Sequence, residues 1–192
     1  MLLPLKKEKM MKIIRQMTFY TEPSEVVVGD KINVKLTDGR KFTATAIHRN
    51  DERILFMFDE CVAERPMNER GGTEGGYEGS DMRKWLNEEL FKSLSKKVQK
   101  RLIENEDGDK LWLLSLAEVC GCDSDFNDCE GQLEYFKTRK NRVADYKGDC
   151  ASWWLRDVVS AAFFAYVYSH GFCTCDGASG AIGVRPAFAI KA

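Results

Sequence analysis

The sequence predicts an α+β fold built from short antiparallel strands and two to four helices. Three observations lead to this prediction. Residues 31–60 alternate apolar and polar side chains around Asp38-Gly39, a strong hairpin signal. Apolar residues then recur at helical spacing in residues 81–102, and strand-like segments return after Ser152. Strands followed by helices and again by strands are typical of an α+β chain.

The chain divides into an N-terminal arm, residues 1–25, and a single domain, residues 26–192. The apolar pieces of the arm are shorter than the core of a signal peptide and are interrupted by charges, so no secretory signal is expected. Residues 31–60 begin the domain as a three-stranded meander, in which Ile32, Val34 and Leu36 alternate with polar neighbours.

A glycine-rich segment, residues 65–80, follows the meander. It contains neither a P-loop nor a dinucleotide-binding glycine pattern, so we interpret it as a long loop. Ser80 is placed to cap a helix whose apolar face carries Met82, Trp85, Leu86 and Leu90. A second helix, capped by Ser95, is predicted from Leu94, Val98 and Leu102.

Three elements are expected between the helices and the C-terminal strands. Residues 110–114, KLWLL, predict a short buried strand. Ser115 and Glu118 form the pattern of a capping box that opens a brief helix. Residues 131–146 place Leu133, Tyr135 and Phe136 on a further helix that is otherwise basic.

Composition excludes several classes of protein. A chain of 192 residues with 44% hydrophobic side chains can bury a sizeable core, so it is not disordered. The net charge of −1, from 29 basic and 30 acidic residues, offers no overall attraction for nucleic acid. Since no apolar run approaches the length of a membrane helix, we expect a soluble protein without membrane insertion, either cytoplasmic or associated with a virion.

The seven cysteines and the acidic segment around residue 125 raise the question of metal binding. Without an export signal, we expect mostly reduced, structural thiols. Cys120, Cys122, Cys129 and Cys150 could bind zinc, although their spacing is unusual for a zinc site. A weak calcium candidate consists of Asp123, Asp125, Asn127 and Glu134, with Asp128 where an EF-hand loop has glycine. We favour a solvated acidic loop and expect neither metal nor cofactor.

The C-terminal tail is unusual in composition, because Lys, Glu, Gln, Met and Trp are all missing between Leu155 and Ile190. Burial of a β-region would remove Lys, Glu and Gln, but it would not remove Met and Trp. Bulky alternating positions in and around the tail are expected to form the scaffold: Trp153, Trp154, Leu155, Ala165, Val167, Val184, Pro186 and Phe188, with Arg185 as a buried hydrogen-bond donor.

Between these positions lies a mixture of aromatic, small polar and cysteine residues that no core would select. Rigid aromatic rings beside small polar groups are typical of protein-recognition surfaces. The predicted ligand-binding residues are Phe163, Tyr168, Ser169, His170, Phe172, Cys173, Thr174, Cys175, Asp176 and Ser179. A structural β-region with a mixed surface is the alternative.

The motifs WWLR and GVRPAF in this tail, with the earlier SDMRKWLNEEL and KLWLLSLAEV, resemble a bacterial and phage family of C-type-lectin-like domains of unknown function. The resemblance covers residues 27–192 and implies a C-type-lectin-like fold. The family's fold is similar to that of the variable proteins of diversity-generating retroelements. There, reverse transcription that errs at template adenines turns AAY codons into NNY codons, which cannot encode the five missing residue types. The resemblance therefore implies a variable ligand-binding region at residues 156–183.

The function we expect is non-enzymatic recognition of a protein or glycan ligand, without calcium. No catalytic motif is visible, and the chain has only two histidines, His48 and His170. One alternative is an enzyme on the same scaffold, similar to the formylglycine-generating or sulfoxide-synthase families, which would use Cys173 and Cys175. The other is a structural or assembly subunit whose arm pairs with neighbours. The sequence does not predict an oligomeric state.

Overall fold

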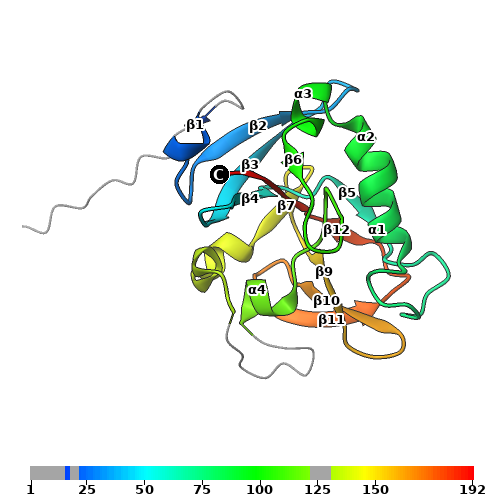
Figure 1. The fold of residues 1–192 in the computed structure, drawn as a ribbon. Coiled ribbons are helices and arrows are strands. Elements are labelled where there is room, and N and C mark those ends of the chain that lie inside the picture. The colour runs from blue at the N-terminus through cyan, green and yellow to red at the C-terminus, as the bar shows by residue number, and fades with distance from the viewer. Residues whose placement is uncertain (1–15, 18–21, 122–130) are drawn as a thin grey trace, which may run out of the picture.

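The computed structural model describes residues 16–17, 22–121 and 131–192. Within these ranges the chain forms a six-stranded sheet, a five-stranded sheet, a two-stranded hairpin and short helices, a mixed α+β architecture of mostly antiparallel strands (Figure 1). The predicted α+β class is confirmed. Most of the predicted arm, residues 1–25, lies outside the described residues. No helix in the described ranges is long and apolar enough to cross a membrane.

The six-stranded sheet contains the predicted meander, formed by β2 (Lys31–Lys35), β3 (Lys41–Arg49) and β4 (Arg53–Phe58). Gly39 adopts a φ of +93° in the turn between β2 and β3, as the hairpin signal requires. The last strand of the chain, β13 (Ala187–Lys191), pairs antiparallel with β4. The sheet is completed by β1 (Gln16–Met17) beside β2 and β6 (Leu102–Ile103) beside β13.

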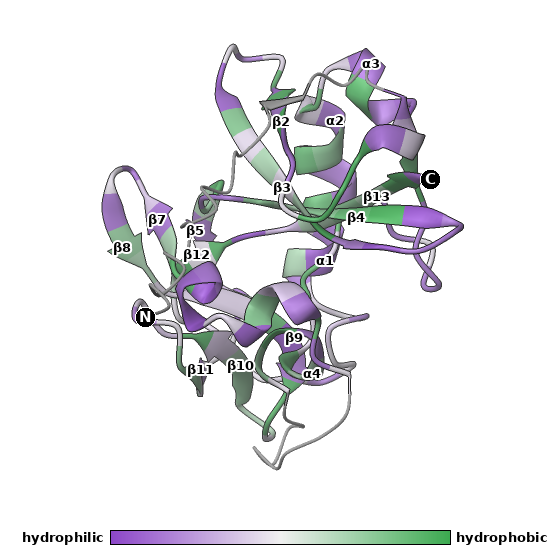
Figure 2. Ribbon diagram, turned by 90° about the vertical axis from the view of Figure 1, so that its left-hand side faces the viewer, coloured by the Kyte–Doolittle hydropathy of each residue, from purple (hydrophilic) through white to green (hydrophobic). Residues whose placement is uncertain are grey.

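The five-stranded sheet has the order β11-β10-β9-β12-β5, so β11 is an edge strand. Its strands are β5 (Ala63–Arg65), β9 (Trp153–Val158), β10 (Phe163–Val167), β11 (Cys173–Gly177) and β12 (Ile182–Val184). A separate hairpin joins β7 (Ala144–Tyr146) to β8 (Asp149–Ala151). Figure 2 shows the six-stranded sheet above β9–β11, with α4 beside the lower strands.

The first predicted helix is confirmed and runs continuously through α1 (Asp81–Trp85), a π-helical turn η2 (Leu86–Leu90) and α2 (Phe91–Ser93). The Ser80 hydroxyl caps it by accepting a hydrogen bond from the N–H of Arg83 at 3.1 Å. The second helix, α3 (Lys96–Gln99), is shorter than predicted. It stops before Leu102 because that residue pairs with Ile190 of β13, so the open sheet edge overrides the helical pattern.

The predicted capping box is confirmed at the start of α4 (Leu116–Cys120), where Ser115 and Glu118 exchange hydrogen bonds of 2.7 and 3.1 Å. Residues 110–114 are largely buried, but they form only an isolated bridge between Trp112 and Ala187 instead of the predicted strand. A short 3₁₀-helix, η1 (Pro23–Glu25), lies between β1 and β2 in the chain.

The single helix predicted for residues 131–146 is wrong. The segment forms two short 3₁₀-helices, η3 (Glu134–Lys137) and η4 (Arg139–Arg142), and then enters β7. The amide of Asn141 donates a hydrogen bond to the carbonyl oxygen of Tyr135 at 2.7 Å, and Nε of Arg142 donates one to Phe136 at 2.9 Å. These side chains satisfy carbonyl groups that a continuous helix would have bonded internally.

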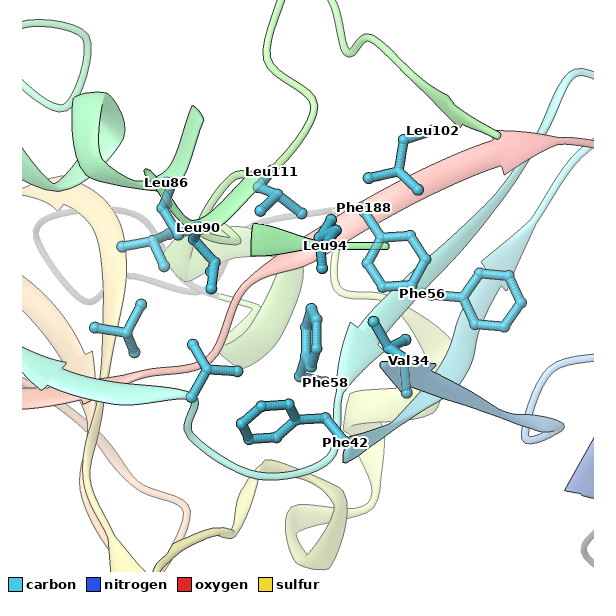
Figure 3. Packing of buried hydrophobic residues seen from close by; sticks show 14 of the residues in the cluster. Val34, Phe42, Phe56, Phe58, Leu86, Leu90, Leu94, Leu102, Leu111 and Phe188 are labelled. Carbon is cyan, nitrogen blue, oxygen red and sulfur yellow. The ribbon is translucent and has the colours of Figure 1, made fainter. Parts of the chain in front are cut away.

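Two hydrophobic cores lie on the two faces of the five-stranded sheet. The first contains Trp154 and Phe164 together with the helix leucines and the phenylalanines of the six-stranded sheet. Figure 3 shows members of this cluster, with Leu86 and Leu90 from the helix and Phe42 and Phe58 from the six-stranded sheet. The second core contains Trp153, Leu155, Ala165, Val167 and Phe136. Because neighbouring strand residues point to opposite faces, the run Trp153-Trp154-Leu155 supplies both cores.

Candidate functional site

The candidate site is the hairpin formed by β10 and β11, which carries most of the predicted ligand-binding residues. Its strands pair in an unbroken antiparallel register from Phe163 opposite Gly177 to Val167 opposite Cys173. We define the hairpin surface as the exposed side chains of this region, which are Phe163, Tyr168, His170, Phe172, Asp176 and Ser179.

Three aromatic residues dominate the turn end of the hairpin surface. Tyr168 and Phe172 are 46% and 56% exposed, and the rings of Tyr168 and His170 meet edge to face with centroids 5.6 Å apart. The guanidinium of Arg139 stacks over the ring of Phe172 at 4.5 Å. An aromatic group held by a cation in this way loses little rotamer freedom when a ligand binds.

The turn between the strands is fixed against η4. The N–H of Gly171 donates to the carbonyl oxygen of Tyr168 at 2.7 Å, and the N–H of Tyr168 donates to Phe172 at the same distance. Gly171 has a φ of +81°, and a Cβ atom there would lie 2.9 Å from the backbone oxygen of Arg139. Only glycine fits this close approach without displacing the turn.

The opposite end of the hairpin is held by the glycine-rich loop. Thr73 is buried and donates its hydroxyl to the carbonyl oxygen of Ser160 at 2.8 Å. The N–H of Asn68 donates to the carbonyl oxygen of Ala178 at 3.0 Å. Phe163, 43% exposed, and Ser179 lie at this end. The loop formed by residues 65–80 therefore supports this end of the hairpin.

The strand residues of the predicted site divide between the two faces of the sheet. Phe163, Cys173 and Cys175 share one face, whereas Thr174 and Asp176 share the other with Phe164 and Tyr166. Ser169, Cys173, Thr174 and Cys175 are only partly exposed. The ten predicted residues are therefore close together on one hairpin but do not form a single patch.

The expectation of reduced thiols is wrong for two cysteines, because Cys120 at the end of α4 and Cys173 at the start of β11 form a disulfide. Their Cα atoms lie 6.5 Å apart although 53 positions separate them in sequence. The pairing removes Cys173 as a thiol and leaves Cys175, on the same face, free. Cys61 is also free but buried, and burial raises the pKa of its thiol to about 12.

The predicted structural residues lie in the interior. Trp153 and Trp154 are fully buried, and their indole N–H groups donate to the carbonyl oxygens of Arg142 and Arg65, each at 2.8 Å. Arg185 is buried, donates to the carbonyl oxygens of Phe58 at 2.8 Å and Asn141 at 3.3 Å, and stacks over Trp153. Burial lowers the pKa of this guanidinium. These side chains lock β9 and β12 to the remainder of the fold.

A cavity of about 490 Å³ lies between the β7–β8 hairpin and the β11 face that carries Asp176. Its walls include Glu64, Tyr146, Asp149, Tyr166 and Asp176. Burial raises the pKa of the Tyr166 hydroxyl, and the Asp176 carboxylate raises it further. Sequence reasoning identified Asp176 but missed this cavity, because its walls come from segments far apart in the chain.

A second hollow of about 620 Å³ lies beside the glycine-rich loop and α1, and includes Trp85. The guanidinium of Arg65 already stacks over the Trp85 ring at 4.9 Å, so a ligand that stacks on this ring would have to displace it. We therefore place the candidate site on the hairpin.

The zinc and calcium hypotheses gain no support from the described residues, among which no group of three or more His, Cys, Asp and Glu side chains could hold an ion. The calcium candidates Asp123, Asp125 and Asn127, and the zinc candidates Cys122 and Cys129, lie outside the described residues. Glu134 is exposed and forms an ion pair with Lys137 at 2.7 Å. Cys120 is bonded to Cys173 in the disulfide, so it has no thiolate for zinc.

Comparisons with known proteins give a family but no function. No curated protein and no solved structure matches the chain. The family model of a domain of unknown function, DUF6273, matches residues 51–192, a range that begins just before β4 and includes β13. Strands β2 and β3 precede the match but share a sheet with β4. Because the match covers well over half of the 192 residues, this chain belongs to the DUF6273 family.

Proposed function

We propose that this protein is a non-enzymatic recognition module whose hairpin surface binds a protein or glycan ligand. The proposal depends on the exposure of large hydrophobic side chains. Of the five large hydrophobic residues exposed in the described part of the chain, three lie on this surface: Phe163, Tyr168 and Phe172. A purely structural hairpin would be expected to bury such rings, whereas a binding surface needs them accessible.

Rigidity of the supporting structure also favours recognition. The hairpin is held by the Cys120–Cys173 disulfide, by the packing of Gly171 on η4 and by the buried hydroxyl of Thr73. A surface fixed before binding loses less conformational entropy when the ligand arrives. The arrangement therefore suits binding of a ligand through side chains that need little rearrangement.

A more specific form of the proposal follows from the sequence resemblance. We propose a C-type-lectin-like domain related to the variable proteins of diversity-generating retroelements, with residues 156–183 as the variable region. The support is the absence of five residue types from the tail. The test is the neighbouring DNA, where a near-copy of the tail's coding sequence that differs mainly at adenines should lie beside a reverse transcriptase gene. An adjacent region with neither would refute diversification.

The disulfide argues against the alternative of an enzyme that uses the thiols of Cys173 and Cys175 together. Cys173 is paired with Cys120, and only Cys175 keeps a thiol on β11.

Binding itself can be tested with two matched variants that each remove exposed apolar groups. The first replaces Phe163, Tyr168 and Phe172 by Ser, and the second replaces the exposed Val27 and Val28 by Ser, outside the tail. A glycan array and a displayed random-peptide library supply the ligands. We expect the first variant to lose binding at least about tenfold while the second binds like the wild type. Ligands that tolerate the first variant, or a lack of any ligand, would contradict the proposal.

A further inference from the structure

We infer, resting on the proposed function, that the ligand is an extended acidic segment of a partner protein that adds as a further strand along β11. Three features of β11 point to this ligand: its open edge, the direction of its backbone groups and the charges at its two ends.

Strand β11 is the outer strand of its sheet, with only β10 beside it in the described part of the chain. Its residues Cys173, Thr174 and Cys175 are partly exposed, and Asp176 is exposed. An open edge strand presents backbone groups to which another polypeptide can hydrogen-bond, and proteins commonly bind extended segments in this way.

The register shows which backbone groups face the open edge. Tyr168 and Phe172 lie opposite each other and are joined by a hydrogen bond of 2.7 Å from N–H to carbonyl oxygen. Since hydrogen-bonded and non-hydrogen-bonded pairs alternate along an antiparallel ladder, Thr174 and Asp176 bond to β10. The N–H and C=O groups of Cys173 and Cys175 then point away from β10, toward the edge.

The open part of the edge has defined limits. Beyond Cys175 the next outward residue is Gly177, whose N–H donates to the Asp176 carboxylate at 2.7 Å and whose carbonyl accepts from the N–H of Gly180 at 2.8 Å. At the other end the N–H of Gly171 is bonded within the turn. A docked strand would therefore align on Cys173 and Cys175, with Phe172 at one end.

Charge complementarity selects an acidic partner and its orientation. The segment of η3 and η4 beside the turn carries Lys137, Arg139, Lys140 and Arg142 against a single carboxylate, Glu134. Arg139 is exposed, contacts Phe172 and forms no ion pair within the described residues. The other end of β11 carries the Asp176 carboxylate. An acidic side chain of the added strand therefore belongs at the Arg139 end, where a bidentate pair with the guanidinium is available.

The experiment removes one outward N–H. Peptides selected from a displayed random library on the wild-type protein are tested against Cys175→Pro and the matched control Cys175→Ala. Proline removes the outward N–H of residue 175 but no bond to β10, a position where edge strands accept proline. We expect the selected peptides to be acidic, to lose about tenfold or more in affinity for Cys175→Pro, and to bind Cys175→Ala within about twofold of the wild type. Arg139→Glu should also weaken binding, and Arg139→Lys should weaken it less.

Amide hydrogen exchange of the wild-type protein supplies a readout that does not depend on whether Cys175→Pro folds. On peptide binding, the N–H groups of Cys173 and Cys175 should become protected. Peptides that need Phe163, Tyr168 and Phe172 but bind Cys175→Pro normally and protect neither amide would overturn strand addition and leave the proposed function intact. Binding of glycans only, through the same aromatic residues, would do the same. A lack of any ligand that depends on the hairpin surface would overturn both.

Discussion

The packing of the β10–β11 turn on η4 can be measured with a pair of glycine substitutions. Gly171 and Gly108 have almost the same φ, +81° and +82°, so replacement by alanine places a side chain at the same positive φ in both. They differ in their surroundings. A Cβ at Gly171 would lie 2.9 Å from the carbonyl oxygen and 3.0 Å from Cγ of Arg139, whereas a Cβ at Gly108 meets nothing within 4 Å.

The expected free energies follow from these contacts. Alanine in the left-handed region costs about 1–2 kcal/mol, and this is the whole effect expected for Gly108→Ala. At Gly171 the nearest atom belongs to the backbone and cannot rotate away, so the turn or η4 must shift, at a further cost of about 1–3 kcal/mol. Urea unfolding of both variants gives the two free energies of unfolding.

The difference between the two variants isolates the turn contact. We also expect Gly171→Ala to separate Phe172 from Arg139 and to weaken ligand binding, while Gly108→Ala binds like the wild type. If the two variants lose the same free energy of unfolding, within about 0.5 kcal/mol, the turn does not depend on close packing against η4. The account of a pre-positioned hairpin would then be wrong.

Three further predictions concern the support of the site. Arg185→Met should lower the free energy of unfolding by about 2–4 kcal/mol, because it removes the donor to the buried carbonyl oxygen of Phe58 and to the partly buried one of Asn141. A loss under about 1 kcal/mol in urea unfolding would refute this. Replacing Cys120 and Cys173 by Ala should lower the free energy of unfolding by about 3–4 kcal/mol, because the disulfide closes a loop of 53 residues. An unchanged melting curve would show that the disulfide does not persist in the folded protein. In the native protein at pH 8, a thiol reagent should label the exposed Cys150 and spare Cys61, whose pKa is raised to about 12 by burial. Equal labelling of both would show that Cys61 is accessible.

Local signals in the sequence predicted the elements whose stabilising contacts are close along the chain. The capping box at Ser115, the N-cap at Ser80 and the hairpin at Gly39 each involve residues only a few positions apart. Phe163 and Phe172 were predicted to be accessible for a different reason, because they belong to a mixture of aromatic, small polar and cysteine residues that no core would select, and both are exposed.

The predictions failed where distant residues decide the outcome. Leu102 joins β13 instead of extending a helix, and residues 131–146 break into short 3₁₀-helices that Asn141 and Arg142 complete through side-chain hydrogen bonds. The disulfide of Cys173 requires a partner from α4 that spacing alone does not indicate. The contact of Arg139 with Phe172 was likewise not predictable, since it depends on how the turn meets η4.

The side chains of the hairpin surface are exposed, whereas the side chains that hold β9 and β10 are buried in the two cores. Surface substitutions of this kind usually change the free energy of unfolding by less than about 0.5 kcal/mol. Substitutions at these positions should therefore leave the fold intact, because Trp153, Trp154 and Arg185 hold it from the interior. If the hairpin surface binds a ligand as proposed, such substitutions would change the ligand at almost no cost in stability, and relatives would differ most at the hairpin.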